Sequence, residues 1–451
     1  MDAFVTTSND FYLNRQSQFE SNARSYPRRF PLALKSALGS RLIDVEGNSY
    51  LDCLAGAGTL ALGHNHPEII ATLQDVLRSG LPLHTLDLTT PVKDRFIADL
   101  LDTLPAGLRA GAKIQFCSPS GTDAVEAAIK LAKTATGRND IVSFRGAYHG
   151  MSQGSLSLMG SLGPKEAVGQ LLGGTHFFPY PYAYRCPFGR GGEETAKLAA
   201  DYFERALTDP EGGINKPAAV ILEAIQGEGG VIPAPVEWLR TIRRVTKDLG
   251  IPLIIDEVQS GIGRTGRFYA FQKAGIIPDI LVLSKAIGGG LPLAVIVYRD
   301  ELDTWKPGAH AGTFRGNQMA MAAGSKTFDV IRQSGLVERA AEAGGRLRSE
   351  LERIAAYSPF IGEVRGEGLM LGIEVVDPYG APDGLGHPPF GPQFARAVQA
   401  DAFRKGLIIE AGGRHGSVLR LLPPLTISDE DLGLVVDILG SAFQRLERKA
   451  A

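Results

Sequence analysis

The chain has 451 residues, more than one simple core usually holds, and this length suits two domains. Hydrophobic residues make up 44% and charged residues 21%, and the formal net charge of −2 leaves no basic face for a nucleic acid. No apolar run is long enough to span a membrane, and residues 1–10 carry two acids and no basic residue. We therefore expect no membrane association and no targeting signal, and we expect a cytoplasmic protein.

In chain order, a hairpin-like stretch at 40–52 comes first, and alternating apolar runs and helical periods follow from about residue 66 to residue 300. Five runs predict strands and two predict helices: strands at 113–117, 141–144, 217–224, 252–256 and 280–283, helices at 122–135 and 236–249. Strands that are apolar on both faces belong in a parallel sheet covered by helices, so the predicted fold class is α/β.

The last third has a different pattern, with a long helix expected at 328–356 and a terminal amphipathic helix at 429–449. Three short apolar stretches predict a smaller sheet: 364–374, 407–410 and 418–421. We therefore expect residues 61–325 to form a large domain and residues 326–451 a smaller α+β domain. The N-terminal segment, residues 1–60, is expected to join the smaller domain.

Three cysteines are present, Cys53, Cys117 and Cys186, and their spacing matches no metal site. Reduced thiols in a cytosolic protein explain them, and no metal is expected.

Lys285 directly follows a predicted buried strand and precedes three glycines. Open α/β sheets bind ligands at the carboxyl ends of their strands. Partial burial there lowers the pKa of a lysine and makes its amine nucleophilic, as a Schiff-base lysine requires. A surface lysine after a strand is the alternative, and Lys285 alone does not exclude it.

Asp256 closes a strand that is too apolar to face water, so its carboxylate needs a cationic partner. In an enzyme that uses pyridoxal 5′-phosphate (PLP), the protonated ring nitrogen is that cation. Val258 is then placed to pack under the ring, and Gln259 to bond the ring hydroxyl. A helix-capping aspartate is the alternative.

The turn Ser120-Gly121-Thr122 follows one strand and opens a helix, and the N-terminus of a helix attracts phosphate. Tyr148 follows the next strand and offers a face on which a flat ring can stack. Simple N-capping and a core aromatic are the alternatives. All four features nevertheless fall at or just beyond predicted strand ends: the turn at 120–122, which we call the phosphate turn, Tyr148, Asp256 and Lys285. Their coincidence by chance is improbable.

Together these residues resemble the class III (ω-) aminotransferases of PLP fold type I, over about residues 20–430. The segments that carry the resemblance are 63–67 (GHNHP), 120–128 (SGTDAVEAA), 148–150 (YHG), 223–228 (EAIQGE), 256–266 (DEVQSGIGRTG), 284–285 (SK) and 312–317 (GTFRGN). The resemblance implies a large domain with a mostly parallel sheet and a smaller α+β domain.

The resemblance also implies roles for single residues. Lys285 holds PLP covalently and moves a proton, Asp256 pairs with the ring nitrogen, and Gly121 and Thr122 hold the phosphate. Thr313 resembles a phosphate ligand that comes from the neighbouring subunit, which implies a homodimer with shared active sites.

A further pair implied by the resemblance concerns the substrates. Arg420 matches an arginine that grips a carboxylate of glutamate or 2-oxoglutarate, and Glu228 matches the glutamate that pairs with it when a terminal amine occupies the site. A structural ion pair is the alternative. Tyr26 lies where related enzymes touch the substrate with an N-terminal tyrosine.

Within the class, three features resemble the diaminobutyrate–2-oxoglutarate aminotransferases: 20–27 (ESNARSYP), 181–187 (PYAYRCP) and Gln318. They imply transfer of the 4-amino group of L-2,4-diaminobutyrate to 2-oxoglutarate. Ornithine, acetylornithine or 4-aminobutyrate are alternative donors. A PLP aminomutase or decarboxylase and a non-catalytic protein of the same fold are alternatives of other classes, and the presence of Lys285 and Asp256 disfavours the last.

Overall fold

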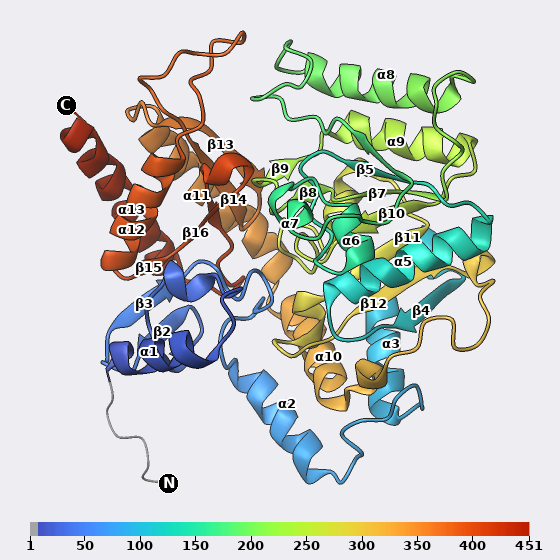
Figure 1. Cartoon of the computed structure of the whole chain (residues 1–451). Helices are drawn as coiled ribbons and strands as arrows, with labels where there is room; N and C mark the ends of the chain where they lie inside the picture. The colour runs from blue at the N-terminus through green and yellow to red at the C-terminus, as the bar shows by residue number, and fades with distance from the viewer. Residues whose placement is uncertain (1–7, 451) are drawn as a thin grey trace.

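The computed structural model describes residues 8–450, and a seven-stranded sheet forms its largest layer (Figure 1). The strands are, from one edge to the other, β4 (Ala112–Phe116), β12 (Val295–Arg299), β11 (Ile280–Leu283), β10 (Leu253–Asp256), β7 (Ala219–Leu222), β5 (Ile141–Phe144) and β6 (Thr175–Phe178). Only β12 runs antiparallel to its neighbours within this sheet. The predicted α/β class with a mostly parallel sheet is confirmed.

The central strands are buried on both faces because their apolar side chains alternate between two hydrophobic layers. In β10, Leu253 and Ile255 join the layer that contains Trp238 of helix α9 (Val236–Asp248), whereas Ile254 joins the opposite layer. That opposite layer contains the apolar face of helix α5 (Gly121–Thr136). The two helices therefore cover opposite faces of the sheet, and α8 (Glu194–Thr208) packs outside α9.

The prediction of one continuous helix at 328–356 is wrong. The chain instead forms α10 (Gln318–Gln333) and α11 (Leu336–Ala355), which are separated by Gly335 in a left-handed conformation with φ 58°. A left-handed residue ends an α-helix, and glycine adopts it without steric cost. The domain boundary that we expected after residue 325 lies inside α10, so the domain division stays a prediction.

Most of the other strands form two four-stranded sheets. One has the order β13 (Ile361–Glu367), β14 (Met370–Val375), β17 (Val418–Leu421), β16 (Glu410–Gly412), and the other has β1 (Leu34–Leu38), β2 (Arg41–Asp44), β3 (Ser49–Asp52), β15 (Leu407–Ile408). The single strand expected at 364–374 is therefore a hairpin, turned by Gly368 at φ 54°. The strand expected at 407–410 is divided between the two sheets. Because β15 pairs with β3, the N-terminal segment is joined to the C-terminal part of the chain.

The other α-helices and strands within residues 8–450 are α1 (Asn9–Phe19), α2 (Pro67–Arg78), α3 (Pro91–Thr103), α4 (Ala106–Arg109), α6 (Gln153–Ser157), α7 (Gly163–Glu166), α12 (Pro392–Arg404), α13 (Asp429–Ala450), β8 (Ile225–Gln226) and β9 (Ile232–Pro233). Within this part of the chain, no helix combines the length and the apolar character needed to cross a bilayer. The expectation of no targeting signal in residues 1–10 falls mostly outside the described residues.

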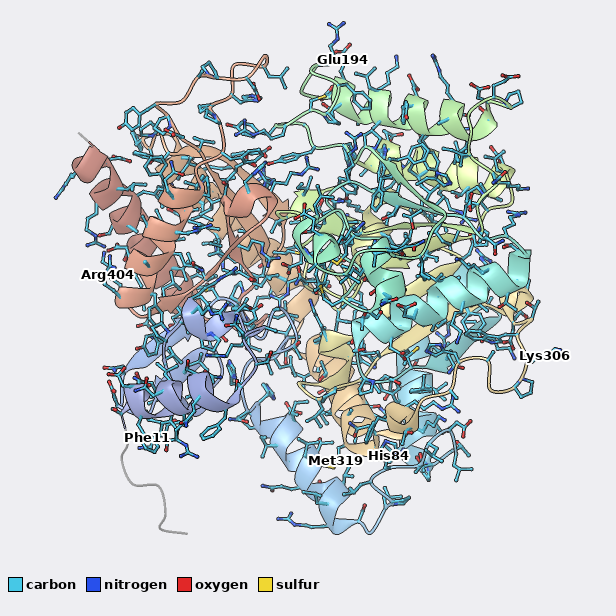
Figure 2. All side chains as sticks on the ribbon, in the orientation of Figure 1. Phe11, His84, Glu194, Lys306, Met319 and Arg404 are labelled. Carbon is cyan, nitrogen blue, oxygen red and sulfur yellow. The ribbon has the colours of Figure 1, made fainter. Side chains whose placement is uncertain are left out.

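The segment before α3 lies beside the start of α10. His84 forms an isolated β-bridge with Asn317, and its ring meets Phe314 edge to face at 5.3 Å. Figure 2 shows the side chains of His84 and Met319 together at this end of the molecule. Large apolar side chains stay exposed here, with Leu88 70% and Phe314 64% accessible to solvent.

Candidate active site

The predicted site residues converge on a cavity of about 280 Å³ beyond the carboxyl ends of β4, β5, β7, β10 and β11. Strands that run parallel end on the same edge of a sheet, so the polar residues that follow them meet there. The lining residues are Ser120, Gly121, Thr122, Tyr148, His149, Gly150, Met151, Glu223, Glu228, Asp256, Val258, Gln259 and Lys285. Of the predicted site residues, only Thr313, Arg420 and Tyr26 do not line it.

Lys285 follows β11 after a single residue, Ser284, and projects into this cavity. Its backbone has a φ of +51°, which costs energy in a residue with a β-carbon and is found at functional sites more often than elsewhere. Burial lowers the pKa of its amine, while the nearby charge of Glu228 opposes that shift. The amine is thus closer to its neutral, nucleophilic form than an exposed lysine would be.

Asp256 ends β10, the strand that neighbours β11, and its carboxylate is buried. Its Oδ1 accepts the backbone N–H of Val258 at 3.0 Å, and its Oδ2 lies 2.8 Å from Nδ1 of His149. The other ring nitrogen of His149, Nε2, is buried and has no hydrogen-bond partner among residues 8–450. The histidine therefore orients the carboxylate, a role we did not predict although His149 lies in the 148–150 motif.

Glu223 is a second buried carboxyl group in the cavity wall, and it too was not predicted as a site residue. Its Oε1 accepts the backbone N–H of Tyr148 and its Oε2 accepts that of Gly227, both at 3.0 Å. Burial raises its pKa to about 7, and the charge of Asp256 adds to the effect. Glu223 thus positions the aromatic at the end of β5.

The turn before α5 has the features of a phosphate cradle. Ser120 caps the helix by accepting the N–H of Asp123, which leaves the first-turn N–H groups of Gly121 and Thr122 without helical partners. A β-carbon on Gly121 would lie 3.1 Å from a methyl group of Val258, so a larger residue would crowd the turn. Thr122 Oγ1 meets Ser152 Oγ at 2.7 Å and Ser155 Oγ at 2.5 Å.

These residues fit PLP. The helix start suits its phosphate, the Asp256 carboxylate suits its protonated ring nitrogen, and Lys285 supplies an amine for its aldehyde. The buried Oε1 of Gln259 has no hydrogen-bond partner in the described part of the chain, as expected of a group that awaits one from the cofactor.

Arg420 and Glu228 form an ion pair at the edge of this cavity. Arg420 lies in β17 and is fully buried, and its Nη1 and Nη2 donate to Oε1 and Oε2 of Glu228, both at 2.8 Å. Nη2 also donates to Oε2 of Glu410 at 2.6 Å. Although burial alone would raise it, the guanidinium holds the pKa of Glu228 below its usual value. Glu410 was not predicted, because nothing local marks a glutamate in a short strand.

The remaining two predicted residues lie apart from the cavity lining. The hydroxyl of Tyr26 lies 3.5 Å from Oε1 of Glu410, and burial, followed by the charge of Glu410, raises the pKa of Tyr26 to about 12. Thr313 is exposed at the start of a short 3-10 helix (Thr313–Gly316) in the segment before α10, outside the cavity of its own chain.

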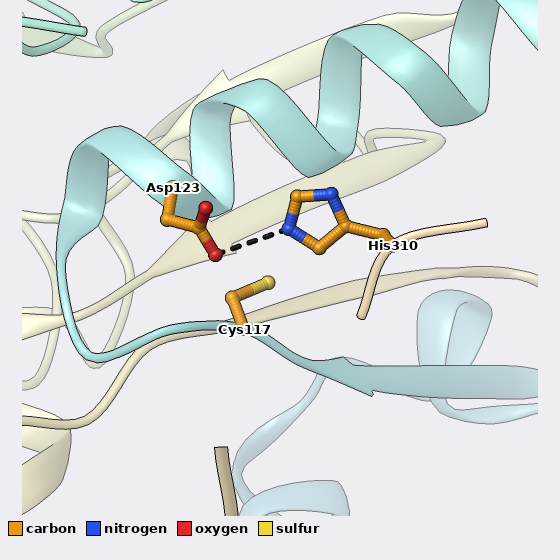
Figure 3. Close-up of side chains that lie close together, drawn as sticks. All are labelled: Cys117, Asp123 and His310. Atoms are coloured by element: carbon orange, nitrogen blue, oxygen red, sulfur yellow. Dashed lines mark hydrogen bonds and ion pairs between the residues drawn. The ribbon is translucent and has the colours of Figure 1, made fainter. Parts of the chain in front are cut away.

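Cys117, Asp123 and His310 form a separate cluster behind the phosphate turn (Figure 3). Nε2 of His310 lies 3.0 Å from Oδ2 of Asp123, and its Nδ1 lies 3.4 Å from Nζ of Lys130. Burial raises the pKa of the Cys117 thiol, which disfavours the thiolate that a metal would require. The His310–Asp123 contact instead ties the loop that carries Thr313 to the phosphate turn.

A buried lysine and an aspartate at neighbouring strand ends, beside a helix start that suits a phosphate, are the arrangement expected of a PLP enzyme of fold type I. The comparisons agree: residues 22–443 match the family model "Aminotransferase class-III", and the chain belongs to that family. It is therefore a PLP-dependent aminotransferase.

Two relatives carry the same functional name. The chain is 78% identical, over its full length and 96% of the relative, to a diaminobutyrate–2-oxoglutarate aminotransferase of Rhizobium meliloti (strain 1021). It is 53% identical, over 95% of the chain and 93% of the relative, to one of Haemophilus influenzae. Among solved structures, a PLP-bound amine transaminase from an uncultivated Pseudomonas species matches with a TM-score of 0.83 and 28% identity, over 95% of this chain and 98% of that one.

Proposed function

We propose that the protein transfers the 4-amino group of L-2,4-diaminobutyrate to 2-oxoglutarate, giving L-aspartate 4-semialdehyde and L-glutamate, and catalyses the reverse reaction. The names of the two relatives support this substrate pair. The observation that carries the proposal is the Arg420–Glu228 ion pair, which borders the cavity that contains Lys285.

The ion pair suits an enzyme that binds two unlike substrates in turn. With Glu228 on Arg420, the guanidinium is neutralised and does not attract a carboxylate into the reacting position. When Glu228 swings away, the same two N–H edges bind a carboxylate of 2-oxoglutarate in a bidentate fashion. Glu228 is the movable partner, because its side chain is 34% exposed whereas that of Arg420 is fully buried.

The other residues have complementary roles in this proposal. Bound PLP carries the amino group between the substrates and withdraws electrons from the reacting carbon. The amine of Lys285 holds the cofactor and removes the proton from C4 of diaminobutyrate. Asp256, oriented by His149, keeps the ring nitrogen protonated, and Gln259 bonds the ring hydroxyl.

The cofactor is held by further contacts in this proposal. Tyr148 and Val258 would hold the ring, and Ser120, Gly121 and Thr122 would hold its phosphate. Tyr26 touches the substrate from the N-terminal segment.

The decisive experiment measures glutamate release from 2-oxoglutarate with a panel of amine donors: diaminobutyrate, ornithine, acetylornithine and 4-aminobutyrate. Diaminobutyrate is expected to have the highest kcat/KM, and to bleach the visible absorbance of the bound cofactor until 2-oxoglutarate restores it. A faster rate with another donor would contradict the substrate, and release of carbon dioxide or turnover without an acceptor acid would contradict the reaction.

We further propose a homodimer with shared active sites, in which Thr313 binds the phosphate of the partner's cofactor, and a cytoplasmic location. The exposed apolar residues around Leu88 and Phe314, on and beside the loop of Thr313, support a contact between subunits there. The domain division at residues 60 and 325 belongs to the same proposal.

Mixed dimers test this arrangement. Lys285→Ala and Thr313→Glu subunits are each expected to be inactive alone. A mixture contains dimers with one site made of intact Lys285 and intact Thr313, and should recover part of the wild-type activity. No recovery in a mixture shown to exchange subunits would contradict shared sites.

A further inference from the structure

Two carboxylates face the buried guanidinium of Arg420, and one of them, that of Glu228, lines the cavity. Arg420 bonds both Glu228 and Glu410, so the three side chains sum to one negative charge. Arg29 also approaches Glu410, but its side chain is 41% exposed and its charge is screened by water. An additional cation stabilises a buried cluster that carries a net negative charge, because it neutralises that charge.

The two glutamates differ in mobility. Glu410 lies in β16 directly opposite Arg420 in β17, and the register of the two strands holds it in place. Its side chain is 7% exposed, compared with 34% for Glu228, which follows the short strand β8 in a turn. Glu410 therefore stays at the site when Glu228 moves.

The two carboxylate oxygens of Glu410 differ in the strength of their hydrogen bonds. Its Oε2 makes a short bond of 2.6 Å to Arg420. Among the described residues, its Oε1 has two contacts, both near the limit of hydrogen bonding: 3.4 Å to Nη1 of Arg29 and 3.5 Å to the hydroxyl of Tyr26. Both of these neighbours are partly exposed, so a stronger donor from a bound molecule can replace them.

We infer that Glu410 recognises the α-ammonium group of a diamino acid donor, an inference that rests on the proposed function. An ammonium group on Oε1 neutralises the excess negative charge and forms a charge-assisted hydrogen bond. 4-Aminobutyrate is diaminobutyrate without the α-amino group, so it brings no such cation. Glu410 thus selects diamino acids over simple ω-amino acids.

The test compares kcat/KM for L-2,4-diaminobutyrate and for 4-aminobutyrate in the first half-reaction, in the wild type and in Glu410→Gln. The variant keeps the shape and an acceptor for Arg420 but removes the charge. Its ratio of diaminobutyrate to 4-aminobutyrate is expected to fall about tenfold or more, mainly through KM, as befits loss of a hydrogen bond between charged groups. Glu352→Gln, which removes a charge from an exposed ion pair with Arg348, should leave the ratio unchanged.

An unchanged ratio would overturn the inference. This holds also when kcat/KM falls equally with both donors, because disturbance of Arg420 alone has that effect. The half-reaction with glutamate reports on Arg420 independently. If Glu410→Gln does not fold, Glu410→Met, which also removes the charge, takes its place, and a folded variant with the wild-type ratio overturns the inference. A wild-type protein that does not convert diaminobutyrate contradicts the proposed function instead.

Discussion

Arg420 and Glu228 meet edge to edge across 192 positions of sequence, with both nitrogen–oxygen distances at 2.8 Å. The arginine is buried in a strand, and the glutamate lies in a turn and lines the cavity. Such a pair is costly to bury unless its geometry is good and its remaining hydrogen bonds are made. The charges of both residues act on the amine of Lys285, so a change in the pair affects the reacting centre.

Glu228→Gln is expected to shift the enzyme toward carboxylate substrates. Without the competing charge, Arg420 is free for the acceptor, so KM for 2-oxoglutarate should fall by about tenfold, the worth of a charge-assisted hydrogen bond. The half-reaction with diaminobutyrate should slow, because the uncovered guanidinium repels an ammonium group. Single-turnover kinetics of the two half-reactions measure both effects, and Glu352→Gln is the control. A parallel loss in both half-reactions would indicate a purely structural ion pair.

Lys285→Ala is expected to abolish covalent attachment of the cofactor and to lower transamination by at least about 10³-fold, since the base that moves the proton is lost. Borohydride reduction followed by mass spectrometry of the peptide containing residue 285 measures the attachment. Lys247→Ala, on the exposed side of α9, is the matched control and should behave as the wild type. A cofactor still bound to another lysine in the variant would contradict the assignment.

His149→Phe is expected to lower kcat by about 10-fold or more while the protein still binds PLP. The substitution removes the 2.8 Å contact that orients Asp256, and a hydrogen bond to a charged group is worth about 1.5–3 kcal/mol. Asp256→Asn should lower kcat further, because it removes the charge itself. The pH dependence of the cofactor absorbance measures the effect on the ring nitrogen. An Asp256→Asn variant with wild-type kcat would refute the proposed pairing.

Glu257→Gln is expected to make the protein less sensitive to rising pH. Burial raises the pKa of Glu257 from 4.5 to about 7, so the folded state keeps a proton that the unfolded state has already lost. The stability contributed by this group is complete below pH 4.5 and is lost as pH rises through about 7, a cost of roughly 3 kcal/mol.

Glutamine suits this position, because its amide oxygen can accept the N–H of Phe271 and its amide nitrogen can donate to the hydroxyl oxygen of Ser260, which lies 2.7 Å from the second carboxyl oxygen of Glu257. Denaturant unfolding at pH 5 and pH 8 measures the difference. The wild type should lose more stability between the two pH values than the variant, and an equal loss would show that Glu257 ionises normally.

Much of the site follows from local sequence. Lys285 and Asp256 each end a run of apolar residues, and Gly121 opens a helix, so strand ends and turn chemistry place all three at one edge of the sheet. The expected strands at 141–144 and 280–283 are confirmed at the same residues. The local sequence pattern did not show that the helix breaks at Gly335 between α10 and α11. A glycine can lie either within a helix or at its end, so its presence alone does not predict a break.

The partners of the buried charges could not be read from the sequence. His149 finds Asp256 across 107 positions, and Glu410 approaches Tyr26 across 384. Short apolar periods and turn residues determine which segments become strands, helices and strand ends, since these depend on neighbours along the chain. Which carboxylate meets which cation depends on how the sheets pack, because a buried charge pairs with whatever the fold brings within a few ångströms. The sequence by itself therefore determined the fold class and pointed to Lys285 as the candidate PLP lysine, whereas only the tertiary structure decided that Arg420 has two partners.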